Sequence, residues 1–239
     1  MSTLFISDLH LSPQRPHLSQ LFFKFLQQQA PQADTLYILG DFFNIWIGDD
    51  DTSAFHRSIS EPLKALAATG VTIYIMVGNH DFLLGKKFCQ ASGCTLLPDP
   101  AIIDLYGHKT LLKHGDDLCV EDKRYLRYRK IARSWLIRNF YLTLPIRLRR
   151  SMANKIRSIS KNNKKVHQQG ISDIPREMIP ITLAKHQVQQ FIHGHTHRPA
   201  IHYLFNSSQP QRHIVLSDWG KTGNFCMAEP NGEMRLAYF

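Results

Sequence analysis

The chain has 239 residues, of which 43% are hydrophobic and 20% charged, as is typical of a globular protein with a substantial core. No run of about 18 apolar residues occurs, so we expect no membrane-spanning helix, while attachment to one membrane face stays open. The formal net charge of +10 is concentrated in one segment: residues 122–165 hold 15 of the 29 Lys and Arg residues and one acid, for a net charge of +14. This segment predicts an anionic partner: nucleic acid, anionic lipid headgroups or a phosphorylated substrate.

The first predicted strand covers residues 4–6 and leads directly into Ser7-Asp8-Leu9-His10. Residues two apart in an extended chain share a face, so Asp8 and His10 are placed to bind one ion together. Taken alone the pair is a weak signal, because a helix-capping Asp beside a surface His gives the same pattern.

The next elements repeat this arrangement. An amphipathic helix is predicted over residues 18–26, and the apolar strand 35–39 ends in Gly40-Asp41. The acidic triplet at residues 49–51 is interpreted as a solvated turn capping the helix predicted over 54–69, with ion binding as the alternative.

A third strand, residues 71–77, ends in Gly78-Asn79-His80-Asp81, which again places ligand-type side chains after a glycine. Successive strand-and-helix units of this kind predict parallel strands whose polar turns meet at one edge of the sheet. A hairpin of residues 102–104 and 110–113 then leads to His114-Gly115-Asp116. Past residue 170 strand patterns return, with the segments 191–192, 201–205, 213–216, 225–228 and 234–238.

The basic segment predicts two helices joined near Pro145, because Tyr125, Tyr128, Ala132 and Trp135 recur at helical spacing, as do Leu148, Met152, Ile156 and Ile159. Its apolar residues fit either packing against the core or a groove for an apolar ligand. Both interpretations remain open.

Loops that follow the predicted strands together carry seven metal-ligand side chains: Asp8, His10, Asp41, Asn79, His114, His195 and His197. Oxygen and imidazole ligands without thiolates suit Mn²⁺, Fe²⁺ or Zn²⁺ in a catalytic site better than a structural zinc. Seven ligands suit two ions if one carboxylate bridges them, and Asp41, on the middle strand, is the best candidate. Two such ions activate a shared water and hold a phosphoryl group for in-line displacement.

Taken together, Asp8-x-His10, Gly40-Asp41, Gly78-Asn79-His80-Asp81, His114-Gly115 and Gly194-His195-Thr196-His197 resemble the signature of calcineurin-like metallophosphoesterases. The resemblance implies an α/β fold, a four-layer αββα sandwich. It also implies one metal held by Asp8, His10, Asp41 and His197, and a second held by Asp41, Asn79, His114 and His195.

A closer resemblance covers nearly the whole chain. Residues 5–11, 40–43, 79–83 and 192–199 and the basic insertion look like the UDP-2,3-diacylglucosamine pyrophosphatases of lipid A synthesis. The resemblance implies that the protein uses Mn²⁺ to hydrolyse UDP-2,3-diacylglucosamine to UMP and 2,3-diacylglucosamine 1-phosphate (lipid X). It also implies a peripheral protein at the cytoplasmic face of the inner membrane. The core is then 1–121 with 168–239, and 122–167 is an inserted helical cap for the lipid. Nucleic acid and an obligate protein partner are not expected.

The same resemblance implies substrate contacts at Asn79, Asp122, Ser160 and His195. Three positions depart from the pattern: His80 stands where Arg is usual, and Lys164 and His167 stand where Asn or Thr and Lys are expected. We expect these three to contact substrate as well. The hypothesis for catalysis is attack of a metal-bridged hydroxide on the uridine-bearing phosphorus, with Asp41 bridging the ions. Asn79 and His195 stabilise the developing charge, and His80 protonates or neutralises the leaving sugar phosphate.

Two other functions fit parts of the sequence. A phosphodiesterase of the same fold acting on nucleic acid or cyclic nucleotides would use the basic segment to bind phosphates, and Tyr125, Tyr128 and Trp135 to stack on bases. A non-enzymatic interaction module would be expected to have lost ligands, and none is missing. The remaining histidines are interpreted as structural, with His193 lying behind the site. The cysteines Cys89, Cys94, Cys119 and Cys226 form no metal-type spacing and, with no signal-peptide pattern, predict reduced thiols in a cytosolic protein.

Overall fold

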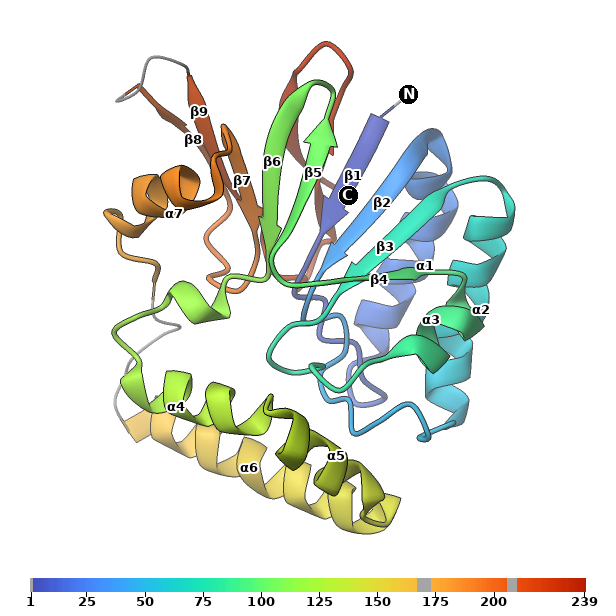
Figure 1. The fold of residues 1–239 in the computed structure, drawn as a ribbon. Helices are drawn as coiled ribbons and strands as arrows, with labels where there is room; N and C mark the ends of the chain where they lie inside the picture. The colour runs from blue at the N-terminus through green and yellow to red at the C-terminus, as the bar shows by residue number, and fades with distance from the viewer. Residues whose placement is uncertain (1, 167–172, 206–209) are drawn as a thin grey trace.

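The computed structural model of the chain describes residues 2–166, 173–205 and 210–239, and its strands form two sheets that face each other (Figure 1). The first has the order β11-β10-β1-β2-β3-β4, with β1 Ser2–Ile6, β2 Ala33–Leu39, β3 Thr72–Met76, β4 Thr95–Leu97, β10 Asn224–Ala228 and β11 Met234–Tyr238. The second has the order β5-β6-β7-β9-β8, with β5 Ala101–Leu105, β6 His108–Lys113, β7 Gln190–His193, β8 Ala200–Leu204 and β9 Gln211–Val215.

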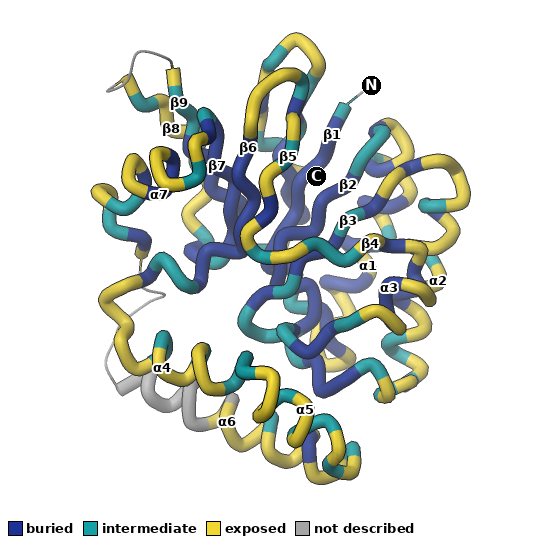
Figure 2. Tube along the Cα trace, in the orientation of Figure 1, coloured by how far each residue is buried: buried dark blue, intermediate teal, exposed yellow. Residues whose placement is uncertain are grey.

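Helices cover the outer faces of both sheets. α1 Pro16–Gln28, α2 Ala54–Ala68 and α3 Lys86–Ser92 lie on the first sheet, and α7 Met178–His186 lies on the second (Figure 1). Buried apolar side chains lie between α1–α3 and the first sheet, between the two sheets, and between the second sheet and α7. The strands are accordingly the most buried part of the chain (Figure 2). The expected αββα sandwich is confirmed.

The central strands explain where the polar turns lie. β1, β2, β3 and β4 pair in parallel, and a parallel strand covered on both faces needs the near-continuous apolar composition that β1 and β2 show. Because these strands run the same way, the turns after β1, β2 and β3 meet at one edge, as predicted.

The structure contains elements that the sequence pattern did not predict. Residues 178–186 form the helix α7, in which Ile179, Thr182 and Leu183 share one face that is buried on the second sheet. The short elements α3 and β4 were not predicted from the sequence pattern.

The basic segment forms three helices instead of the predicted two: α4 Lys123–Ala132, α5 Trp135–Thr143 and α6 Ile146–Val166. The break falls at Ser134, whose extended backbone (φ −64°, ψ 141°) ends the first helical run. These helices lie as a layer below the sandwich, on the side where β1, β2 and β3 end (Figure 1). Much of α4 and α5 is exposed (Figure 2). In the part of the chain that the structure describes, no helix is both long and apolar enough to cross a bilayer.

Candidate active site

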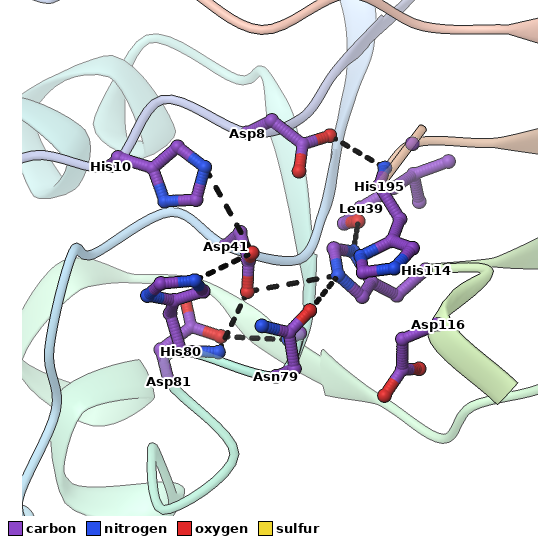
Figure 3. Close-up of polar contacts among 12 residues, drawn as sticks. Asp8, His10, Leu39, Asp41, Asn79, His80, Asp81, His114, Asp116 and His195 are labelled. Atoms are coloured by element: carbon purple, nitrogen blue, oxygen red, sulfur yellow. Dashed lines mark hydrogen bonds and ion pairs between the residues drawn. The ribbon is translucent and has the colours of Figure 1, made fainter. Parts of the chain in front are cut away.

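The polar turns at the sheet edge bring the predicted metal ligands together (Figure 3). Of the seven, five have left-handed backbone: Asp8 (φ 56°), His10 (φ 49°), Asp41 (φ 50°), His195 (φ 65°) and His197 (φ 57°). Non-glycine residues rarely adopt this conformation, and each costs about 1–3 kcal/mol unless its surroundings hold it. Backbone hydrogen bonds between the two neighbouring turns supply that support: Asp8 N donates to Gly40 O over 3.1 Å and His10 N to Asp41 O over 2.9 Å.

One group of ligand atoms comes from the first turn and from the turn after β7. Asp8, His10 and His197 present atoms that all lie within 4.8 Å of one another, and His197 Nε2 is 3.2 Å from Asp8 Oδ1. The other ring nitrogen of His197 faces Asp218 Oδ2 at 3.6 Å. A carboxylate behind a ligating histidine orients its ring. Asp218 was missed from the sequence, although it follows β9 as the predicted ligands follow their strands.

A second group contains Asp41, His114 and His195, again within 4.8 Å of one another. His114 Nε2 lies 3.6 Å from Asp41 Oδ1 and 3.0 Å from Asn79 Oδ1, while its Nδ1 lies 3.0 Å from Leu39 O. A carbonyl is only an acceptor, so Nδ1 carries a proton and Nε2 points to the ligand cluster. Asn79 is thereby placed with this second group.

Asp41 lies between the two groups. Its Oδ1 faces His114, and its Oδ2 is 3.9 Å from His10 Nε2. His80 Nε2 also approaches Asp41 Oδ2, at 3.8 Å, so His10, Asp41 and His80 form a further potential ligand group. His80 was predicted to act on substrate and not as a ligand; the geometry permits either.

Charges in the site shift several pKa values. Burial lowers the pKa of His195 to about 4, and the charge of His114 acts in the same direction. Burial also lowers the pKa of His114, but the carboxylates of Asp41, Asp8 and Asp116 outweigh it and raise the value to about 9. Burial raises the pKa of Asp41, but the neighbouring histidines more than offset this and lower it. The site therefore favours ionised carboxylates before any ion binds.

Asp81 is a buried carboxylate that was not predicted as a site residue. Its Oδ1 accepts from Gly78 N at 2.7 Å and its Oδ2 from Phe43 N at 3.1 Å, so it links the two turns that carry Asp41 and Asn79. Burial and the nearby Asp41 raise its pKa to about 7. The Asp in Gly78-Asn79-His80-Asp81 was visible in the sequence, but its link to Phe43 depends on the tertiary fold.

The residues present fit two divalent ions. The cluster supplies carboxylate oxygens, an amide oxygen and imidazole nitrogens, which are ligands of Mn²⁺, Fe²⁺ and Zn²⁺. His10 Nε2 faces Asp41 Oδ2 at 3.9 Å and His114 Nε2 faces Asp41 Oδ1 at 3.6 Å, both beyond hydrogen-bond distance. Ring nitrogens held at this distance on either side of one carboxylate suit sites that cations complete.

The structure describes only part of the set of insertion residues that we expect to contact substrate. Asp122 caps α4, with its Oδ1 accepting from Tyr125 N at 2.8 Å, and it is exposed. Ser160 and Lys164 lie on α6, but their side chains fall outside the described part of the structure. His167 lies outside the described residues.

The interpretation of the acidic triplet was wrong. Asp49 accepts from the backbone nitrogens of Gly85, Lys87 and Phe88, so it caps α3, whereas Ser53 caps α2. Asp50 pairs with Arg149 and Asp51 with Arg150, both on α6. The triplet therefore joins the core to the basic helices.

His193 packs behind the predicted metal ligands rather than among them. Its Nε2 lies 2.7 Å from His213 Nε2, and its Nδ1 lies 2.8 Å from Gly194 O. Its predicted position behind the site fits this arrangement.

Comparison with known proteins places the chain in a family. The calcineurin-like phosphoesterase family matches residues 1–199. The chain is 46% identical to a UDP-2,3-diacylglucosamine hydrolase of Pseudomonas aeruginosa strain UCBPP-PA14, over 100% of this chain and 99% of the relative. It is 47% identical to one of Pseudomonas entomophila strain L48, over 99% and 98%. A solved archaeal phosphodiesterase shares the fold, with a TM-score of 0.52 and 12% identity over 100% of both chains. The chain belongs to the calcineurin-like phosphoesterase family.

Proposed function

We propose that this protein hydrolyses UDP-2,3-diacylglucosamine to UMP and 2,3-diacylglucosamine 1-phosphate (lipid X) with two Mn²⁺ ions. The observation that carries the proposal is the convergence of all seven ligand residues on the two sides of Asp41. The relatives named UDP-2,3-diacylglucosamine hydrolase, similar along almost the whole chain, support the choice of substrate.

Bound ions would supply an activated water and neutralise phosphoryl charge. The residues that would hold one ion are Asp8, His10, Asp41 and His197, and those for the other are Asp41, Asn79, His114 and His195. The pKa of His195, lowered to about 4, keeps its ring neutral at pH 7 and able to ligate. The Asn79 amide group, with its oxygen toward His114, retains two N–H donors to stabilise charge on the uridine-bearing phosphoryl group.

His80 is proposed to neutralise the leaving sugar phosphate rather than to protonate it. Its Nδ1 lies 3.0 Å from Asn44 O, which accepts from it, so Nε2 carries a proton only when the ring is charged. The second pKa of a phosphate monoester is about 6, so the leaving group departs at neutral pH without needing a proton.

The basic helices are proposed to form the cap, residues 122–167, that selects the lipid. Large apolar side chains are exposed on them, with Trp135 at 73%, Leu136 at 71% and Phe140 at 67% exposure. Acyl chains need apolar contacts and the diphosphate needs cations, and this segment supplies both. The same combination suits peripheral attachment to the cytoplasmic face of an anionic inner membrane.

The proposal is tested by incubating the purified protein with UDP-2,3-diacylglucosamine and Mn²⁺ in ¹⁸O-labelled water. We expect UMP and lipid X, with the heavy oxygen in UMP because attack occurs at the uridine-bearing phosphorus. Label in lipid X would place the attack on the other phosphorus. Asp41→Asn, checked for folding by its thermal melt, is the control. Absence of UMP, or normal turnover by Asp41→Asn, contradicts the proposal.

The alternative function, a nucleic-acid phosphodiesterase, is tested by letting single-stranded DNA and the acylated UDP-sugar compete for the protein. Of the aromatic residues considered for base stacking, Tyr125 already packs its ring against His195, with the ring centres 6.4 Å apart, and donates its hydroxyl to Asp116. Strong inhibition of UDP-sugar hydrolysis by single-stranded DNA, with no inhibition of DNA cleavage by the acylated UDP-sugar, would favour the nuclease.

A further inference from the structure

Asp116 is a fully buried carboxylate two residues after the proposed metal ligand His114. Two side chains of α4 and that of Arg133, which follows the helix as its C-cap, converge on it. Tyr125 donates its hydroxyl to Oδ2 of Asp116, and Arg129 Nε donates to the same oxygen over 2.7 Å. Arg133 Nη2 lies 3.4 Å from it. These three residues recur every four positions, so one face of α4, continued by its C-cap residue, is directed at a single carboxylate beside the proposed metal site.

Arg133 also contacts the turn that carries Asn79. Its Nη2 donates to Gly78 O over 2.8 Å, and its guanidinium carbon lies 6.0 Å from the centre of the Phe82 ring. The two contacts lie on either side of Asn79 in the sequence. One arginine of the inserted helices therefore spans the ligand turn from its beginning to its end.

Gly78 packs directly against Asp41. A Cβ on Gly78 would collide with Asp41 Oδ1 and with its backbone nitrogen, so the turn rests directly on the central carboxylate. Asp41 Oδ1 in turn accepts from His80 N at 2.8 Å. A shift of the turn therefore moves Asn79 relative to His114 and disturbs Asp41.

The charges explain why Arg133 is held in one place. Two guanidinium groups approach Oδ2 of the buried Asp116, Arg129 Nε at 2.7 Å and Arg133 Nη2 at 3.4 Å. A buried carboxylate that faces two cations fixes the donors around it. Arg129 has a second acidic neighbour, Asp99, at 3.5 Å. For Arg133, Asp116 supplies the carboxylate and Gly78 the carbonyl.

We propose that Arg133 is a positioning residue that fixes the Asn79 turn and so couples the inserted helices to the metal site, with Asp116 holding Arg133 in place. No positioning role was assigned to Arg133 or to Asp116 from the sequence. The inference depends on the proposed function only for the lipid substrate used to measure KM.

The test compares Arg133→Gln, Arg133→Lys and Asp116→Asn with Arg127→Gln, which removes the same charge from an exposed position on the same helix. Two readouts do not need the lipid: Mn²⁺ affinity, from the free-ion signal in electron paramagnetic resonance, and hydrolysis of bis(p-nitrophenyl) phosphate. Thermal melts identify any variant that is not folded, and Arg133→Lys keeps the charge if Arg133→Gln does not fold.

We expect Arg133→Gln to bind one of two Mn²⁺ ions about tenfold more weakly, as found when groups behind metal ligands are removed. We expect kcat to fall by a similar factor for both the lipid and the small diester, with KM for the lipid little changed. Asp116→Asn should change the same quantities and Arg133→Lys should change them less. Arg127→Gln should match the parent protein in Mn²⁺ affinity and in hydrolysis of the small diester, the two readouts that do not use the lipid.

Unchanged Mn²⁺ affinity in folded Arg133→Gln overturns the inference, as does a loss confined to KM for the lipid, since Arg133 would then act by binding substrate. If the parent protein does not cleave UDP-2,3-diacylglucosamine, the proposed function fails while the metal and diester measurements still decide the role of Arg133.

Discussion

Arg149 on α6 donates through Nη1 to Asp50 Oδ1 over 2.8 Å, joining the insertion to the loop after β2 across 99 positions of sequence. Arg149 is 1% exposed, and it also donates to Ile47 O over 2.6 Å and to Leu144 O over 2.9 Å. Gly48 permits this approach, since a Cβ there would collide with the guanidinium group. This contact and the Asp116 cluster fix opposite parts of the inserted helices to the core.

Replacement of Arg149 by Met should lower the free energy of unfolding by about 2–3 kcal/mol, because buried carbonyls lose their donors. Urea unfolding followed by circular dichroism measures the change. Asp50→Asn should cost less than about 1 kcal/mol, since Asp50 is about half exposed and its charge is screened by solvent. Equal losses in the two variants would contradict the importance of the carbonyl contacts.

Mn²⁺ binding should release protons and strengthen with rising pH. The pKa of His114, raised to about 9, leaves its ring protonated in the metal-free protein at pH 7, whereas a ligating ring must be neutral. Between pH 6.5 and 8.5 the apparent affinity should therefore rise about tenfold per pH unit for each proton displaced. Titration calorimetry in buffers of different ionisation enthalpy counts these protons. A pH-independent affinity would exclude His114 as a ligand.

His80→Arg should keep kcat within about tenfold of the parent value, because arginine supplies a permanent charge and two donors for a phosphate. His80→Gln should lower kcat about 100-fold, since it removes the charge. The kcat of His80→Arg separates the two roles of His80, because an arginine can neutralise a phosphate but does not give up a proton at neutral pH. If His80 acts as a general acid, His80→Arg will be as slow as His80→Gln.

Exposed apolar residues on α5 should mediate binding to anionic membranes. Trp135→Ser with Leu136→Ser should reduce cosedimentation with phosphatidylglycerol vesicles at least tenfold, because each side chain gives up about 1 kcal/mol or more of apolar burial. Ile102→Ser, at an exposed apolar position on β5, is the control. Binding that survives the double substitution but disappears in high salt would assign the attachment to the basic residues alone.

The sequence predicted that the seven proposed ligands meet, because each follows a strand and parallel strands bring their ends to one edge of a sheet. It did not predict Asp218 behind His197, or the contact of Arg133 with Gly78, because those pairs form only when loops of particular shape bring distant segments together. α7 was not predicted, because its helical period extends over only nine residues. For Trp135 the sequence left packing against the core and an apolar groove open. The helix break at Ser134 places Trp135 at the start of α5, where its side chain is 73% exposed.

The left-handed backbone at Asp8, His10, Asp41, His195 and His197 affects how mutants of this site are interpreted. Replacing one of these residues by alanine removes a ligand and also places a poorly suited residue at an unfavourable φ, so lost activity would combine two effects. Asparagine tolerates this conformation best among non-glycine residues. Asp→Asn and His→Asn variants therefore isolate the ligand itself, and alanine scanning of this site would assign to metal binding a loss that partly belongs to folding.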